Sequence, residues 1–179
     1  MLLAYADDID IIGNSMRTVS GAFAAIERQS NIMGLQVNEA KTKYFLSTSR
    51  DHQRLDRQVN INNHKFELVE DFVYLGPSVN RHNNISWEIK RRSTLANRCY
   101  FGLSRQMNSR ALSRRTKITL YKSLIQPVLL YGAESWTMTT NDELILSVFE
   151  RKILRKIFGP IRVDEGYRIR MNHELYTLH

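Results

Sequence analysis

Apolar positions follow two different periods along this 179-residue chain, one in each half. Short apolar runs separated by turn residues mark residues 1–80, which indicates strands and hairpins around one helix. From Ser86 onward the apolar residues recur every three or four positions, as they do in amphipathic helices. The pattern predicts an α+β fold with a sheet-bearing part over 1–80, a helical part over 81–159 and a C-terminal extension over 160–179.

The first half opens with two apolar runs, 1–4 and 9–13, which predict two strands of a buried sheet joined through Asp7-Asp8. A helix is expected after them, with Ser15 as its N-cap and Gly34 as its stop. Its apolar face consists of Met16, Val19, Phe23, Ile26, Ser30 and Met33. This face is expected to pack on the sheet that bears Asp7.

Three further elements are expected before residue 80. A strand over 43–47 returns to the sheet, after a backbone turn at Asn38. Residues 48–64 are polar and mixed in charge, which suits a loop or an edge hairpin. Residues 66–75 alternate between apolar and polar in two short runs around Glu70-Asp71, which predicts a hairpin with one buried face.

The second half is expected to form a bundle of three amphipathic helices. The first runs from Trp87 to Met107 with Ser86 as its cap, and the second covers 114–130 with a kink at Pro127. The third begins near residue 141 with acidic side chains in its first turn and stops at the Gly159-Pro160 pair.

Asp7 and Asp8 are the first candidates for chemistry, because adjacent carboxylates between apolar runs are costly unless a partner compensates them. Their hard oxygen atoms, with no Cys or His beside them, suit Mg²⁺ or Mn²⁺. Asp7 is the preferred metal ligand and Asp8 assists it, whereas Asp10 is expected to be a surface or ion-paired residue. The alternative is that Asp-Asp is only the centre of a tight turn.

Charge is divided unevenly between the two halves. Residues 1–80 carry 8 basic and 10 acidic side chains, whereas residues 81–179 carry 18 basic and 8 acidic ones. Nine basic residues and no acidic one lie between Lys90 and Lys117. So one-sided a run favours phosphate contact over a merely solvated face, which normally mixes signs. The candidate nucleic-acid-binding residues are Lys90, Arg91, Arg92, Arg98 and Arg105. The pairs Arg151-Lys152 and Arg155-Lys156 form either a second patch or only a solvated ridge.

Other classes of protein are disfavoured by composition. The single cysteine, Cys99, rules out an internal disulfide framework, and no Cys/His spacing matches a zinc site. No segment approaches the roughly 18–20 apolar residues that a membrane span requires. The chain is therefore expected to be soluble and intracellular, with no membrane partner.

Five segments in order carry a resemblance to a known family. Tyr5-Ala6-Asp7-Asp8 resembles the Tyr-x-Asp-Asp box of reverse transcriptases, and the later segments are similar to the palm, primer-grip and thumb regions of non-LTR (LINE-type) retrotransposon enzymes. These later segments are 34–42, 66–76, 130–136 and 149–159. The resemblance covers nearly the whole chain.

This resemblance implies an RNA-directed DNA polymerase, with the end of a palm over 1–80 and a thumb in the helical part. Asp7 and Asp8 would hold two Mg²⁺ or Mn²⁺ ions for nucleotidyl transfer. Lys41 would lie near the triphosphate as a general acid, or else be a solvated lysine at a strand entrance. The primer grip would consist of Phe72, Tyr74, Leu75 and Gly76, unless this hairpin only joins palm to thumb.

The implied partners are an RNA template, a DNA primer and deoxynucleoside triphosphates, and the implied location is nuclear. The family's metal site needs a third carboxylate and its template a fingers domain, both before the Tyr-x-Asp-Asp box, where only four residues stand here. The chain is thus expected to be inactive alone and to need the upstream part of the same polyprotein. The alternative function is a non-catalytic, basic nucleic-acid-binding module in which Asp7 and Asp8 are remnants.

Overall fold

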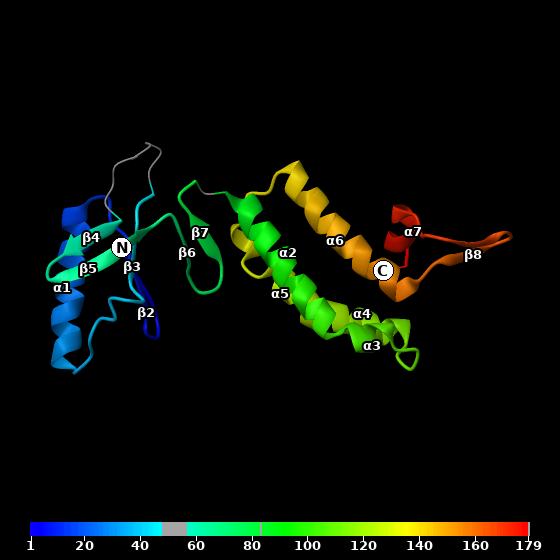
Figure 1. Ribbon diagram of the computed structural model, residues 1–179, viewed down its shortest axis with the longest axis horizontal. Helices are drawn as coiled ribbons and strands as arrows, with labels where there is room; N and C mark the ends of the chain where they lie inside the picture. The colour runs from blue at the N-terminus through cyan, green and yellow to red at the C-terminus, as the bar shows by residue number, and fades with distance from the viewer. Residues whose placement is uncertain (48–56, 83, 179) are drawn as a thin grey trace. The chain divides into compact units, whose positions relative to one another are not determined.

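The computed structural model describes residues 1–47, 57–82 and 84–178. They form two compact units: unit 1 comprises Met1–Tyr74 with Ser78–His82, and unit 2 comprises Leu75–Pro77 with Asn83–His179. Small sheets and one helix make up unit 1, and helices dominate unit 2 (Figure 1). The α+β fold class is confirmed. None of the described helices is both long enough and apolar enough to cross a bilayer.

The first element of unit 1 is the expected hairpin. Strand β1 (Leu2–Tyr5) pairs antiparallel with β2 (Asp8–Ile11), and Tyr5 lies directly opposite Asp8. The expectation of a buried sheet was wrong, since β1 and β2 form a two-stranded sheet of their own. Every side chain of β1 is exposed, whereas Ile11 of β2 reaches the core of the unit.

Helix α1 (Met16–Ile32) follows the sequence signals at both ends. The Ser15 hydroxyl accepts a hydrogen bond from the Thr18 amide at 3.3 Å, which confirms this residue as the N-cap. Gly34, just past the end, has a φ of +75°, a left-handed conformation that glycine adopts without strain. The local sequence therefore defines α1 almost completely.

The core of unit 1 lies between α1 and a three-stranded sheet. The sheet has the order β3 (Lys43–Phe45), β5 (His64–Val69), β4 (Gln58–Ile61), with β3 parallel and β4 antiparallel to β5. The Phe23 ring of α1 meets the Phe66 ring edge-on at a centroid distance of 5.3 Å. Helix α1 thus packs on this sheet through Phe23, and it also adjoins β2 of the Asp7-bearing hairpin, as expected, where Ile11 joins the same cluster.

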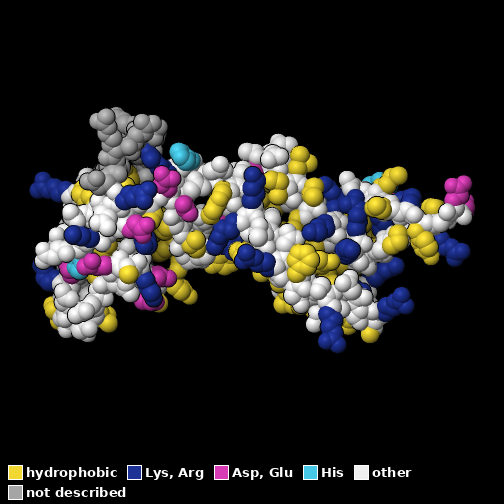
Figure 2. Space-filling model, in the orientation of Figure 1, with side chains coloured by type: hydrophobic (Ala, Val, Ile, Leu, Met, Phe, Trp, Pro, Cys, Tyr) yellow, Lys and Arg dark blue, Asp and Glu magenta, His cyan; other side chains and the backbone are white. Residues whose placement is uncertain are grey.

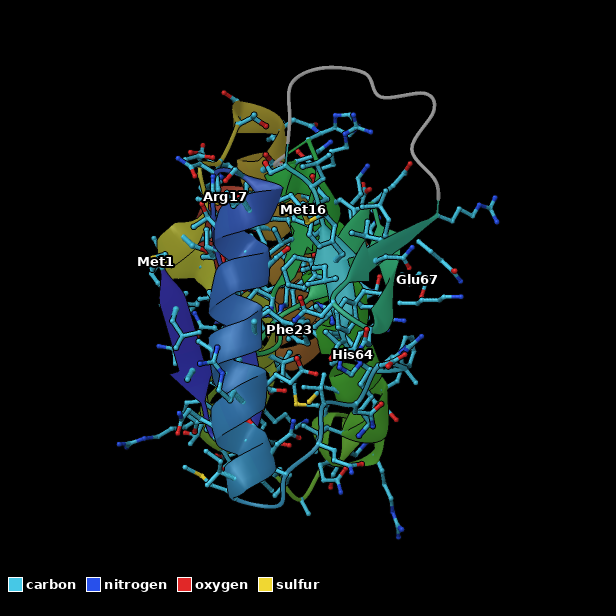
Figure 3. The ribbon with its side chains drawn as sticks, turned by 90° about the vertical axis from the view of Figure 1, so that its left-hand side faces the viewer. Met1, Met16, Arg17, Phe23, His64 and Glu67 are labelled. Carbon is cyan, nitrogen blue, oxygen red and sulfur yellow. The ribbon has the colours of Figure 1, made fainter. Side chains whose placement is uncertain are left out.

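Figure 3 shows the same face of α1, with Phe23 turned toward the strand that carries His64. The predicted strand over 43–47 is confirmed in shorter form as β3. Of the predicted loop or edge hairpin over 48–64, residues 48–56 lie outside the described residues, and the part from 58 onward enters β4 and β5.

The hairpin predicted around Glu70-Asp71 was wrong in its pairing. Both edges of β5 are already occupied, by β3 and β4, so the strand that follows cannot pair with it. Instead β6 (Asp71–Val73) pairs antiparallel with β7 (Ser78–Asn80). The Tyr74-Leu75-Gly76 segment lies at the tip of this later hairpin.

Unit 2 contains three long helical stretches and a C-terminal segment. Its helices are α2 (Ile85–Gly102), α3 (Ser104–Asn108), α4 (Arg114–Leu120), the π-helix Tyr121–Ile125, α5 (Gln126–Leu130), the 3₁₀-helix Ala133–Ser135, α6 (Thr140–Phe158) and α7 (Asn172–Tyr176). A short hairpin of β8 (Ile161–Val163) and β9 (Gly166–Arg168) separates α6 from α7.

The three predicted helices are present, and the first two differ in detail from the prediction. The first is interrupted at Leu103, and its N-cap is Asn84, because Ser86 already lies inside the first turn. In the second, a π-helical turn precedes Pro127, whose missing N–H is a common source of such irregularity. The third has a capping box between Thr139 and Asp142.

The core of unit 2 draws on all three long stretches. Its buried residues are Ala96, Tyr100, Met107, Tyr121, Ile125, Leu129, Phe149, Ile153 and Ile157. A second cluster joins Leu154 and Phe158 of α6 to Leu175 of α7, so the C-terminal segment packs on α6. Three of the core residues, Phe149, Ile153 and Ile157, lie four apart on one face of α6, in agreement with the helical period expected after Ser86. The identification of the two units as palm and thumb stays a prediction.

Candidate active site and nucleic-acid interface

Asp7 and Asp8 lie at and beside the turn of the β1–β2 hairpin. Because Tyr5 pairs with Asp8, only Ala6 and Asp7 form the turn, and Ala6 takes a φ of +52°. Both carboxylates are exposed. The turn reverses the chain after Tyr5, so Tyr5 and Asp7 do not lie on one strand.

The strand register adds a residue that the sequence argument had set aside. Side chains alternate along a strand, so Asp8 and Asp10 share one face of β2 while Ile9 and Ile11 share the other. Their face lies opposite Ile11, which packs on the core of unit 1; Asp8 is exposed and Asp10 is half-buried. The two-residue turn at Ala6-Asp7 determines that β2 begins at Asp8 and so which side chains share its face. Ala-Asp is not one of the residue pairs that mark a two-residue turn in a sequence, so this start of β2 could not be predicted.

The donor set at this hairpin fits one part of a magnesium site. Magnesium is usually held by one or two carboxylates together with substrate phosphates and water, and exposed aspartates at a turn supply such oxygens. Among the described residues, no three His, Cys, Asp or Glu side chains gather closely enough to hold a metal ion by themselves. A metal bound by Asp7 and Asp8 would therefore need further ligands.

Lys41 lies in the loop before β3. Its amide donates to the side-chain and main-chain oxygens of Asn38, both at 3.2 Å, which confirms the predicted turn at Asn38. The Lys41 side chain is exposed. Within the described residues, no hydrogen bond or ion pair joins it to Asp7 or Asp8, so its role as a general acid stays a prediction.

The predicted primer-grip residues fall into two environments. The ring of Phe72 lies 5.1 Å from the ring of Phe45, inside unit 1. Tyr74, Leu75 and Gly76 form the hairpin tip with unusual backbone angles: φ is +49° at Leu75 and +104° at Gly76. Of these four residues, Leu75 at the tip is the one whose side chain is exposed.

Within unit 2, the tip is held by Arg91 of α2 and by Tyr131, which follows the end of α5. The Tyr131 hydroxyl donates to the Leu75 carbonyl at 2.8 Å, and Arg91 Nη1 donates to the Gly76 carbonyl at 3.0 Å. The ring of Tyr131 also carries the Arg92 guanidinium above it, 4.7 Å from the ring centroid.

Glu88 provides the charge that binds these arginines. Its carboxylate accepts from Arg92 Nε at 2.6 Å and from Arg91 Nη1 at 3.2 Å. Glu88 is 2% exposed and Arg92 6%. Arg92 is therefore engaged internally and not on a free surface, which disagrees with its predicted place among the phosphate ligands. The i, i+4 spacing of Glu88 and Arg92 is a signal for this pair that the sequence already contains. Glu88 lies two residues before the start of the acid-free run at Lys90.

The other predicted basic candidates, Lys90, Arg98 and Arg105, are exposed. Figure 2 shows many Lys and Arg side chains over unit 2, whereas Asp and Glu are concentrated over unit 1. The Lys152 ammonium of α6 donates to the Asn97 side chain of α2 at 3.2 Å and lies 6.0 Å from the Phe101 ring. Phe101 itself is 65% exposed.

These residues make a basic surface with an aromatic ring at its centre. The α2–α6 surface is formed by Asn97, Arg98, Phe101 and Lys152. Arg98 neighbours Phe101 on α2 because residues three apart share a helix face. Phe101 was missed by sequence reasoning, since an aromatic residue in an amphipathic helix normally belongs to the core.

The second predicted patch on α6 is partly occupied by the C-terminal segment. Arg155 donates to the Arg170 carbonyl at 3.3 Å and to Asn172 Oδ1 at 2.7 Å. Arg151 donates to the Tyr176 hydroxyl at 3.4 Å. These arginines fasten the C-terminal segment to α6, whereas Lys156 stays exposed.

A transposon-derived protein of Caenorhabditis elegans is 30% identical to this chain over 157 residues. The match covers 88% of the chain and 56% of that protein, so the chain spans little more than half the length of the curated relative it matches. No protein-family model matches the chain, and no solved structure matches it significantly. The similarity supports a transposon-related origin.

Proposed function

We propose that this chain is the part of a non-LTR retrotransposon reverse transcriptase that carries the Asp-Asp hairpin, the primer-holding hairpin and the thumb. The observation that carries the proposal is the exposed Asp7-Asp8 pair at the turn of a β-hairpin. The transposon-derived relative supports the origin, and the net basic helical unit supports a nucleic-acid ligand.

On this proposal the residues divide the work of nucleotidyl transfer. Bound Mg²⁺ would stabilise the charge that develops on the attacking and leaving oxygens. Asp7 and Asp8 would supply the carboxylate oxygens for it, and Lys41 would protonate the departing pyrophosphate. The primer 3′-hydroxyl would attack the α-phosphate of the incoming nucleotide while the Leu75–Pro77 tip holds the primer end. Further parts of the same polyprotein would supply the third carboxylate and the template-binding domain.

The test is RNA-templated incorporation of deoxynucleotides by this chain joined to its in-frame upstream coding region. Asp7→Asn and Asp8→Asn are expected to lower incorporation by at least about a hundredfold, the usual scale for losing a transition-state stabiliser. Asp164→Asn is the matched control, because Asp164 occupies the turn between β8 and β9 and is equally exposed. Full activity in Asp7→Asn would refute the assignment.

A second candidate function is supported by the α2–α6 surface. Basic side chains around an exposed aromatic ring bind nucleic acid through phosphate contacts and stacking, without any metal. On this alternative the chain is a non-catalytic binding module. It predicts that RNA–DNA hybrid binding is indifferent to Mg²⁺-ligand substitutions and that the extended protein incorporates no nucleotides.

A further inference from the structure

We propose that Glu88, Arg91, Arg92 and Tyr131, the tip latch, are positioning residues that hold Leu75–Pro77 in shape to receive the end of a nucleic-acid strand. On this inference Arg91 and Arg92 act through the tip and do not bind phosphate themselves. The identity of the ligand rests on the proposed function, whereas the latch rests on contacts inside unit 2.

The backbone of the tip requires external support. Leu75 has a φ of +49°, in the left-handed region that branched L-residues rarely occupy. Such a conformation persists only where its surroundings over-determine it, and it is concentrated at ligand-binding sites. Here the hydrogen bond from Tyr131 fixes the Leu75 carbonyl and that from Arg91 fixes the next carbonyl, at Gly76.

The tip also fits its seat too closely for side chains at two positions. A Cβ on Gly76 would lie 3.0 Å from Cε1 of Tyr131, and one on Gly132 would lie 3.0 Å from Cγ of Pro77. Both glycines have positive φ, +104° and +79°. Gly76 lies against Tyr131, and Gly132, the next residue after Tyr131, lies against Pro77 of the tip. Because neither glycine has a side chain, the tip backbone can approach Tyr131 directly.

The charges of the latch are directed inward. Buried Glu88 needs cationic partners, and moving Arg92 to a phosphate would break the shorter of its two arginine contacts, 2.6 Å from Arg92 Nε against 3.2 Å from Arg91 Nη1. Arg91 divides its Nη1 between Glu88 and the Gly76 carbonyl. The two arginines therefore fix the tip relative to α2, and their charges are engaged inside unit 2.

The ligand-facing side of the tip is apolar. The Leu75 side chain is 40% exposed, so the tip can pack on a sugar or base, whereas phosphates find their charge elsewhere on unit 2. This chemistry favours recognition of a strand end, at which the last sugar and base are accessible. A positioning role thus predicts a preference for ends and not a change in salt dependence.

The experiment uses the 179-residue chain with Tyr131→Phe, Arg91→Gln and the matched control Arg98→Gln, whose arginine is exposed on the same helix. Three quantities are measured for each: amide hydrogen exchange over residues 74–80, the salt slope of RNA–DNA hybrid binding, and the affinity ratio between hybrids with and without a recessed DNA 3′ end. Circular dichroism and thermal unfolding verify the fold of each variant.

The latch variants are expected to speed exchange at the tip about tenfold or more and to lose the end preference, with an unchanged salt slope. Arg98→Gln is expected to leave exchange and end preference unchanged and to reduce the slope by roughly 0.7–0.9. A reduced slope in Arg91→Gln with unchanged tip exchange would overturn the inference, because Arg91 would then be a phosphate ligand. A wild-type chain without end preference would overturn the proposed ligand, while the exchange rates would still decide whether the latch exists.

Discussion

The imidazole of His64 donates through Nε2 to the carboxylate of Glu27, and this bond ties the start of β5 to α1. The other ring nitrogen, Nδ1, pairs with Glu39 in the loop before β3. One histidine thus joins three segments of unit 1 that are distant in sequence. Figure 3 shows His64 beside the Phe23 side of α1, where the two rings meet edge-on at 5.5 Å.

This histidine makes the stability of unit 1 depend on pH. Hydrogen bonds to Glu27 and Glu39 raise the pKa of His64 above 6.5, and the bond from His64 lowers the pKa of Glu27 below 4.5. The stabilisation that charged His64 gives to the folded state is fully present below pH 6.5 and is lost as the pH rises through the raised pKa of His64 in the folded state. The stabilisation from ionised Glu27 is fully present above pH 4.5 and is lost as the pH falls through the lowered pKa of Glu27. Unit 1 should therefore be most stable in mildly acidic solution.

We predict that His64→Gln lowers the thermal unfolding temperature at pH 5.5 and has a much smaller effect at pH 9. The measurement is thermal circular dichroism of wild type and variant across this range. His82→Gln is the control, since this histidine of unit 1 is exposed. A difference between wild type and His64→Gln that does not vary with pH would show that His64 contributes through packing and not through its charge.

The core of unit 1 provides a second prediction. Phe66 is 2% exposed and clusters with Phe23 and Ile61, and these are the three buried residues of this cluster among the described residues. Phe66→Ala should lower the free energy of unfolding of unit 1 by about 3–5 kcal/mol, which is a large part of a typical domain's stability. Val73→Ala, at a 54% exposed position of the same unit, should change it by less than about 0.5 kcal/mol. Amide exchange of α1 in denaturant measures both, and equal effects would contradict the core assignment.

The successful sequence predictions depend on local physics. Ser15 and Gly34 bound α1, and Gly159 ends α6, because caps and left-handed stops are determined within a few residues. The turn at Asn38 is equally local. Each of these signals could be read without knowledge of any distant contact.

The errors concern contacts and strand registers that the pattern of residue types does not specify. The edges of β5 are filled by a strand 24 residues earlier and by its own hairpin partner, which no alternation pattern reveals. Arg92 appeared to be a surface charge until Glu88, Tyr131 and Gly76 were found around it. Asp10 joined the face of Asp8 only when the two-residue turn set the register. In each case the sequence supplies the chemistry and the tertiary pairing supplies the geometry.

Two glycines allow a direct test of the tip's close packing. Gly76→Ala places a Cβ 3.0 Å from Tyr131 at a φ of +104°, so it should disturb the tip and speed local hydrogen exchange over 74–80. Gly102→Ala is the control: its Cβ meets nothing within 4 Å, at the end of α2. That control should be neutral or stabilise the chain by about 0.4–1 kcal/mol, since alanine restricts the unfolded chain. Unchanged exchange in Gly76→Ala would mean that the tip can move off Tyr131 without cost.

Substitutions on the α2–α6 surface can distinguish the contribution of charge to nucleic-acid binding from that of base stacking. Lys152→Gln should weaken binding of an RNA–DNA hybrid and reduce the salt slope by roughly 0.7–0.9, because one phosphate contact and its counterion release are lost. Phe101→Ala should cost about 1–3 kcal/mol for single-stranded nucleic acid with an unchanged slope, because stacking releases no counterions. Fluorescence anisotropy at several salt concentrations measures both the affinity and the salt slope.

Lys117→Gln is a further control, since that half-buried lysine of α4 lies outside the surface as defined. If Phe101→Ala leaves single-strand affinity unchanged while Lys152→Gln lowers it, the surface binds backbone alone and the exposed ring has no part in recognition.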